Sequence, residues 1–76
     1  ENKDVSYVIY PNPANRGAEV SINATPRIKN VFLTNILGEQ VRFGQSINTS
    51  GLAKGTYIID IEFYSGNFAQ NKLIIE

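Results

Sequence analysis

The sequence predicts an all-β fold, a compact immunoglobulin-like antiparallel β-sandwich of six to seven short strands. Three observations predict it. Apolar residues recur at every second position along most of the chain, turn residues interrupt these runs about every ten residues, and no window has helical apolar spacing over more than one turn. With 76 residues, the chain is long enough for one small core. We therefore expect residues 1–76 to form a single domain.

The first half of the chain contains two alternating runs. Apolar residues stand at every second position in residues 5–9 and again in residues 18–24, as expected of strands with one buried face. Between them, Pro11-Asn12-Pro13 cannot continue a strand ladder, because neither proline has an amide proton to donate. Gly17 follows as an expected left-handed turn residue.

The middle of the chain has shorter apolar runs. We expect strands at residues 31–33 and 40–43, joined by a turn at Gly38, and a further short strand around Ile47. The pairs Thr25-Pro26 and Ser50-Gly51 have the composition of turns on either side of this region.

The last two strands are expected to form a hairpin. Residues 57–63 carry the most regular alternation in the chain, and residues 69–75 alternate in the same way. Ser65-Gly66-Asn67 lies between them and has the chemistry of a tight hairpin turn.

A few apolar residues break the alternation and are predicted to face outward. They are Val8, Phe32, Ile58 and Ile74. Scattered surface apolar residues are common and are the favoured interpretation. The alternative is an exposed apolar patch that docks a partner or the parent protein. The sequence leaves this alternative open, because it does not show whether these side chains meet.

Composition excludes several functional classes. The chain has no His and no Cys, which rules out a Ser-His-Asp triad, a Cys nucleophile, a disulfide, and a His or thiolate zinc site. Its 7 Lys and Arg residues balance 7 Asp and Glu residues, without the basic patch that binds nucleic acid. No apolar stretch approaches the roughly 20 residues of a membrane helix. The sequence predicts a binding, targeting or structural module, with no enzymatic activity, cofactor, metal site or membrane insertion.

Two groups of side chains have residue types found in active or binding sites. Asp60 and Glu62 share one strand face, but a catalytic pair also needs a cleft that makes one group less acidic than the other. We interpret them as part of a solvated face. The four tyrosines have side chains that can stack on sugars. Because Tyr7 and Tyr57 are predicted to face inward, core packing is the preferred interpretation.

Four short motifs follow one another along the chain. They are Tyr10-Pro11-Asn12-Pro13, Asn35-Ile36-Leu37-Gly38-Glu39-Gln40-Val41, Leu52-Ala53-Lys54-Gly55-Thr56-Tyr57 and Lys72-Leu73-Ile74-Ile75-Glu76. Their order resembles the type A C-terminal sorting domains of proteins exported by the type IX secretion system of Bacteroidetes. Those domains carry a Y-P-N-P box, an L-G-x-x-V turn, an L-x-x-G-x-Y box and a tail of lysine and apolar residues. Glu76 departs from the basic or neutral last residue of many relatives.

The resemblance implies a function and a set of partners. Such a domain belongs to a larger secreted protein and directs it from the periplasm across the outer membrane, to the cell surface or the medium. The implied partners are the type IX translocon, an outer-membrane shuttle protein and a surface sortase. The sortase typically removes the domain by cutting just before it, which places the cut around residues 1–4 or upstream.

The resemblance also divides the motif residues into two roles. Recognition by a partner is expected at the tail, which comprises Lys72, Leu73, Ile74, Ile75 and Glu76. Structural roles are expected for Tyr10, Pro11, Asn12, Pro13, Leu37, Gly38, Leu52, Gly55 and Tyr57. If the tail forms an edge strand, its main chain can pair with a partner, and an edge-strand homodimer becomes plausible.

Two other functions fit the predicted fold. An adhesion or carbohydrate-binding module predicts an aromatic platform or a calcium loop and saturable sugar binding. A passive structural cap predicts that deletion lowers the stability of the parent protein without changing its destination. Residues added after Glu76 separate these from a sorting signal, because they should impair sorting and leave sugar binding intact.

Overall fold

The computed structural model describes residues 5–25 and 27–76, and within them it contains seven strands and one short 3₁₀ helix. The strands are β1 (Ser6–Tyr10), β2 (Glu19–Thr25), β3 (Ile28–Thr34), β4 (Gln40–Phe43), β5 (Ser46–Asn48), β6 (Gly55–Phe63) and β7 (Phe68–Ile75), and the helix is η1 (Thr49–Gly51). The predicted all-β class is confirmed. The turn predicted at Pro26 and the cut predicted around residues 1–4 fall on residues outside this description.

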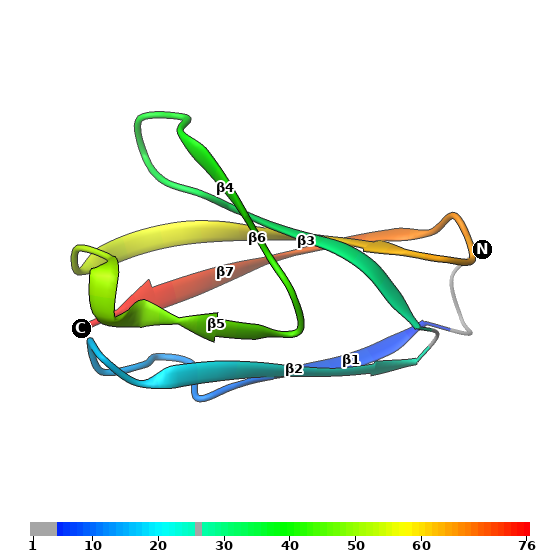
Figure 1. The fold of residues 1–76 in the computed structure, drawn as a ribbon, viewed down its shortest axis with the longest axis horizontal. Coiled ribbons are helices and arrows are strands. Elements are labelled where there is room, and N and C mark those ends of the chain that lie inside the picture. Colours follow the sequence, from blue (N-terminus) through cyan, green and yellow to red (C-terminus); the bar gives the residue numbers. More distant parts are fainter. Residues whose placement is uncertain (1–4, 26) are drawn as a thin grey trace.

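The strands form two antiparallel sheets that face each other (Figure 1). One sheet has the order β1-β2-β5 and the other the order β4-β3-β6-β7. The predicted sandwich and the predicted hairpin between β6 and β7 are confirmed. In the hairpin turn, the N–H of Gly66 donates to the carbonyl oxygen of Phe63 (2.9 Å).

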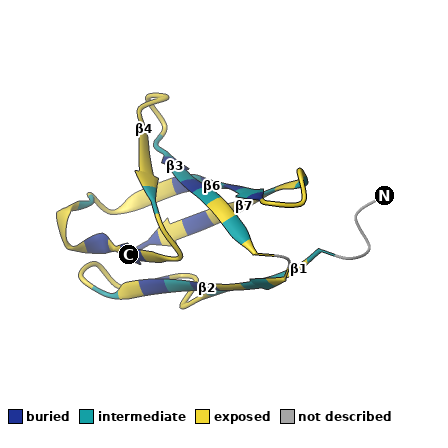
Figure 2. Cartoon of the chain, turned by 45° about the vertical axis from the view of Figure 1, so that its right-hand side comes forward, coloured by how far each residue is buried: buried dark blue, intermediate teal, exposed yellow. Residues whose placement is uncertain are grey.

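The core lies between the two sheets and is built from the inward positions of the alternating runs (Figure 2). The apolar residues buried there are Ala14, Val20, Ile22, Val31, Leu33, Ile47, Tyr57, Ile59, Ile61, Phe63, Leu73 and Ile75. Full burial of one large aliphatic or Phe side chain contributes about 1.5–3 kcal/mol. Alternation with a period of two therefore fixes which face of each strand turns inward.

Strand bounds follow the sequence pattern closely, with one clear difference. β4 covers the predicted residues 40–43, whereas β3 begins at Ile28, three residues before the predicted start. Ile28 pairs with Phe63 of β6, and the register then shifts between Ile28 and Asn30. This irregularity breaks the period of two, which is why the local pattern does not extend the strand.

The hairpin of β3 and β4 rises away from the rest of the sandwich at its tip (Figure 1). β1 begins at one end of the molecule, and β7 ends at the opposite end (Figure 1). Among the described residues, no helix has the length and apolar character needed to cross a membrane.

Candidate functional site

The predicted recognition tail comprises the last four residues of β7, the edge strand of the four-stranded sheet, and Glu76, which follows the strand. Its side chains alternate between two environments. Leu73 and Ile75 are buried in the core, whereas Lys72, Ile74 and Glu76 are exposed. Two of the five residues thus stabilise the fold, and three lie where a partner can reach them.

The first motif lies directly beside this tail, although the two are far apart in the sequence. The side chain of Asn12 makes two hydrogen bonds to the main chain of β7. Its Nδ2 donates to the carbonyl oxygen of Lys72 (2.7 Å), and its Oδ1 accepts from the N–H of Ile74 (3.2 Å). The carboxamide therefore takes the place of a peptide group in a neighbouring strand.

The chain after the first motif continues along the tail. The N–H of Ala14 donates to the carbonyl oxygen of Ile74 (2.8 Å), and the N–H of Glu76 donates to that of Ala14 (2.7 Å). The N–H of Arg16 then donates to the carbonyl oxygen of Glu76 (3.0 Å). Residues 12–16 are named the clasp here, because they cover the edge of β7 along the tail.

The clasp changes what the tail can offer to a partner. The N–H of Lys72 donates to Oδ1 of its neighbour Asn71 (3.0 Å), so each outward main-chain group from Lys72 to Glu76 is bonded within the chain. A partner that adds a strand to a sheet edge needs unpaired main-chain groups. The prediction that the tail offers its main chain to a partner is therefore wrong for the folded chain. Its outward side chains are what it presents.

Prolines and a glycine set the course of the clasp. Pro11 and Pro13 follow the end of β1 at Tyr10 and have no N–H for strand pairing, as the sequence predicts. Both proline peptide bonds are cis. Gly17 has a φ of +96°, so the predicted left-handed turn before β2 is confirmed.

Thr49 in η1 fixes the far end of the clasp, and the sequence analysis missed it. Its side chain is fully buried. Its Oγ1 accepts from the N–H of Gly17 (2.9 Å) and donates to the carbonyl oxygen of Ala18 (2.6 Å). A hydroxyl residue in a short turn is a weak sequence signal, because most such side chains face solvent.

The second motif forms the tip of the β3–β4 hairpin. Oδ1 of Asn35 accepts from the N–H groups of Leu37 (2.9 Å) and Glu39 (3.0 Å), which closes the loop on itself. Gly38 has a φ of +86°, so the predicted turn at this glycine is confirmed. The side chains of Ile36 and Leu37 are 86% and 79% exposed.

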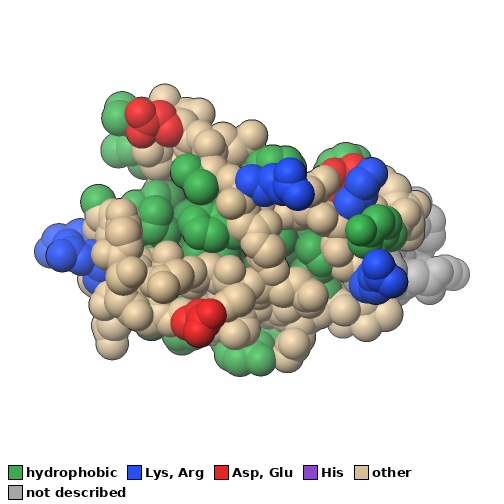
Figure 3. Space-filling view, in the orientation of Figure 1, with side chains coloured by type: hydrophobic (Ala, Val, Ile, Leu, Met, Phe, Trp, Pro, Cys, Tyr) green, Lys and Arg blue, Asp and Glu red, His purple; other side chains and the backbone are tan. Residues whose placement is uncertain are grey.

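The third motif faces the second across a groove. Leu52 follows η1, Gly55 begins β6, and Tyr57 is buried with its hydroxyl donating to the carbonyl oxygen of Ala53. The predicted core position of Tyr57 is confirmed. The groove has a volume of about 220 Å³, and Figure 3 shows apolar side chains gathered beside the hairpin tip. The four motifs thus meet in two pairs, the first with the fourth and the second with the third.

The other groups that the sequence singled out are dispersed. Asp60 and Glu62 lie on the outward side of β6 and do not line the groove. Tyr7 packs against the core, Tyr10 ends β1 in one sheet, and Tyr64 follows β6 in the other. The structure therefore does not bring the tyrosines together as one platform.

Comparison with protein-family models matches residues 8–76 to the family described as the secretion system C-terminal sorting domain. The chain belongs to this family. The match covers nearly the whole chain and includes all four motifs. Neither the curated proteins nor the solved structures contain a match.

Family membership defines the general role of the sorting domain. It is a C-terminal sorting signal of type IX secretion, which implies contact with the secretion machinery and a cargo that is secreted or carried on the cell surface. The family is not an enzyme family. Within the sorting domain, the tail and the clasp together form the candidate recognition site.

Proposed function

We propose that this chain directs a cargo protein from the periplasm through the type IX translocon and is then removed by a surface sortase. Its partners are the translocon, the outer-membrane shuttle protein and the sortase. Residues 1–76 act as one sorting domain of a larger secreted protein. The domain has no catalytic role of its own.

The family match over residues 8–76 carries this proposal, because that range contains the clasp and the tail. The hydrogen bonds of the clasp add support. They hold the tail in one conformation, so Lys72, Ile74 and Glu76 project from a fixed strand. A partner that binds the folded domain gains affinity from such preorganisation.

The arrangement of the strands fits removal by a sortase. The expected cut, around residues 1–4 or upstream, precedes β1, and β1 begins at the opposite end of the molecule from the tail (Figure 1). The longest dimension of the domain is 34 Å. In this arrangement the machinery can hold the tail while the sortase acts at the other end.

A localisation assay tests the proposal. A periplasmic signal peptide and a fluorescent reporter are fused in front of residues 1–76, and the fusion is expressed in a bacterium with a working type IX system. We expect the reporter on the cell surface or in the medium. In the same bacterium without the translocon, and for the reporter without the domain, we expect it in the periplasm.

Retention of the full fusion in the periplasm, while a native cargo is exported normally, would contradict the proposal. Sugar binding by the isolated domain would then be the next measurement, because it is the prediction of the carbohydrate-binding alternative. Among residues 5–25 and 27–76, no contact favours that alternative over sorting, since the exposed Tyr10 ends β1 in one sheet and the exposed Tyr64 lies in the turn after β6 of the other.

A further inference from the structure

Strand register brings together three of the four apolar residues that break the alternation. Phe32, Ile58 and Ile74 lie on the outer face of the four-stranded sheet, and Val8 lies on the other sheet. Opposed residues share a face of a sheet. The opposed pairs are Phe32 with Asp60, Ile58 with Lys72 and Thr34, and Ile74 with Thr56, all outside the core.

These three residues follow a diagonal across the sheet, from β3 through β6 to the tail in β7. Each is a diagonal neighbour of the next on that face, and the ring of Phe32 can span such a separation to reach Ile58. We name Phe32, Ile58 and Ile74 the outer stripe. Ile74 is 37% exposed, and the other two are half-buried. The structure thus favours an apolar patch over scattered surface residues for these three positions.

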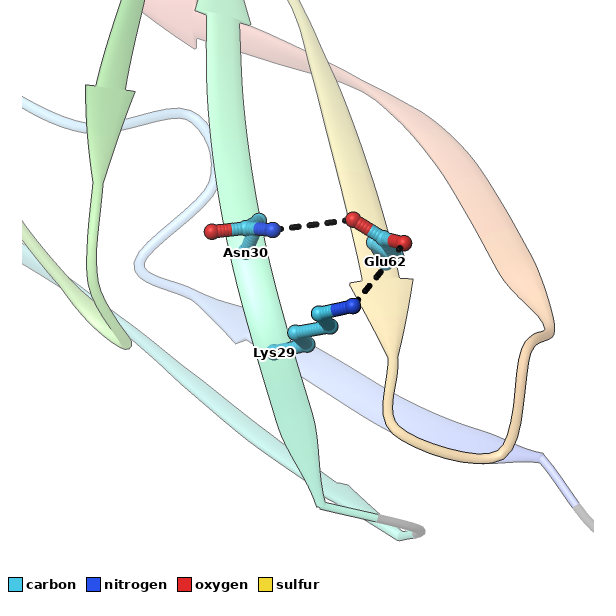
Figure 4. Close-up of polar contacts among 3 residues, drawn as sticks. All are labelled: Lys29, Asn30 and Glu62. Carbon is cyan, nitrogen blue, oxygen red and sulfur yellow. Dashed lines mark hydrogen bonds and ion pairs between the residues drawn. The ribbon is translucent and has the colours of Figure 1, made fainter.

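The acidic residues beside the outer stripe are bonded within the same face. Asp60 accepts a hydrogen bond from Nε2 of Gln70 (2.8 Å). Glu62 accepts one from Nδ2 of Asn30 (2.9 Å) and forms an ion pair with Lys29 (3.9 Å), as Figure 4 shows. Each carboxylate is therefore already hydrogen-bonded inside the domain, and Glu62 also faces a cation, whereas Asp60 keeps its negative charge beside Phe32.

The basic residues beside the outer stripe, unlike Glu62, take part in no ion pair among the described residues. Arg42 lies opposite Phe32, and Lys72 lies opposite Ile58, and both are exposed. Among residues 5–25 and 27–76, the one ion pair joins Lys29 to Glu62, so neither Arg42 nor Lys72 takes part in one. The outer stripe is bordered by two cations whose charge is available to a partner.

We propose that the outer stripe, with Arg42 and Lys72, is the docking face for a protein of the secretion machinery whose own surface has an apolar centre flanked by carboxylates. This protein binds the tail through side chains while the clasp remains closed, because the clasp occupies the main chain of the tail. The inference rests on the proposed sorting function. A protein fits this face better than an anionic lipid surface, which typically requires a cluster of about 4–8 basic residues.

Substitutions on the docking face test the inference in the reporter fusion described above. The variants are Arg42→Glu, Lys72→Glu and the double change Ile58→Thr with Ile74→Thr. We expect each to lower the initial export rate by about tenfold, because the charge reversals place a carboxylate against the partner's carboxylates and the double change removes apolar residues from the centre of the face. The matched controls are Lys54→Glu, an exposed lysine in the loop before β6, and Val8→Thr, an exposed apolar residue on the other sheet. Both should export like the unchanged domain.

The outcomes separate the inference from the function on which it rests. Failure of the unchanged fusion to reach the surface contradicts the sorting function. Export of the unchanged fusion and of all three variants at equal rates overturns the docking face alone. Circular dichroism melts of each purified variant show whether a loss of export reflects unfolding. Charge-dependent binding of the domain to anionic lipopolysaccharide vesicles, lost in the same variants, would overturn the choice of a protein partner.

A disulfide across the clasp tests whether it stays closed. Ala14 and Ile75 are bridge partners on adjacent segments, and such segments lie about 4.8 Å apart, within the Cα range of disulfides. The chain has no cysteine, so Ala14→Cys with Ile75→Cys introduces a single pair that can oxidise in the periplasm. We expect the locked variant to export like each single cysteine variant. Retention of the locked variant alone would show that the clasp must open, which overturns the inference.

Discussion

At the scale of single residues, Asn12 is the side chain that links the beginning of the chain to its end. Its carboxamide provides both a donor and an acceptor, and each meets a main-chain group of the tail. An apolar or smaller residue at this position would leave the carbonyl oxygen of Lys72 and the N–H of Ile74 to water. A glycine or alanine would therefore keep the fold but loosen the tail.

Asn12→Ala should lower the free energy of unfolding by about 1–3 kcal/mol, because a typical hydrogen bond contributes about 0.5–1.5 kcal/mol and two are lost. Urea unfolding measures this, and hydrogen exchange at the N–H of Ile74 should become faster. Asn23→Ala is the matched control, since exposed Asn23 makes one side-chain hydrogen bond, to Tyr10. Equal losses in the two variants would contradict the role of Asn12.

Thr49→Val should lower the free energy of unfolding by about 1–3 kcal/mol, because the N–H of Gly17 loses its acceptor at the buried Thr49 side chain without a change in side-chain shape. Thr49→Ser keeps the hydroxyl and should retain both hydrogen bonds, so it should be the more stable variant. Thermal unfolding of the two variants side by side measures the difference. A valine variant as stable as the serine variant would show that the hydroxyl is dispensable.

Gly38→Ala should lower the free energy of unfolding by about 1–2 kcal/mol, because an L side chain at a φ of +86° meets its own main chain. No other atom lies within 4 Å of the added Cβ, so the cost is conformational and not a packing clash. Gly44→Ala is the control, because Gly44 also has open space and its φ is not in the left-handed range. Chemical denaturation of both variants gives the comparison, and an unaffected Gly38→Ala variant would contradict the turn geometry.

At the scale of the elements, the strands were predictable and their long-range pairing was not. Alternation is a local property, and it placed β2, β4 and β6 close to their observed bounds. The pairing of Asn12 with the tail depends on how two sheets bring distant segments together, and no local pattern contains that information. The same holds for Thr49, whose burial comes from the turn before β2 packing over η1.

In β7, the inward side chains stabilise the fold and the outward side chains are available for recognition. Leu73→Ala should lower the free energy of unfolding by about 2–5 kcal/mol, as expected for a fully buried leucine. Ile74→Ala should lower it by less than about 1 kcal/mol, because Ile74 is partly exposed. In the reporter fusion, at a temperature where the Leu73→Ala variant stays folded, Ile74→Ala should lower export more than Leu73→Ala does. Equal stability of the two variants would contradict the assigned inward and outward faces.

At the scale of the whole molecule, the sandwich brings four motifs of the sequence together in two pairs. The clasp and the tail meet at one edge of the four-stranded sheet, and the β3–β4 hairpin meets the segment that leads into β6. Deletion of the tail would remove Leu73 and Ile75 from the core along with the partners of the clasp. A loss of sorting after deletion therefore does not distinguish a recognition defect from unfolding.

The measurement that tests the central claim most directly changes only the outward side chains of the tail. Lys72, Ile74 and Glu76 are each replaced by Ser in the reporter fusion, while Leu73, Ile75 and the clasp stay as they are. We predict that the unchanged domain carries the reporter to the surface and that the triple variant, with an unfolding transition close to that of the unchanged domain, leaves it in the periplasm. Equal export of the two would contradict the claim that the tail is recognised through these side chains.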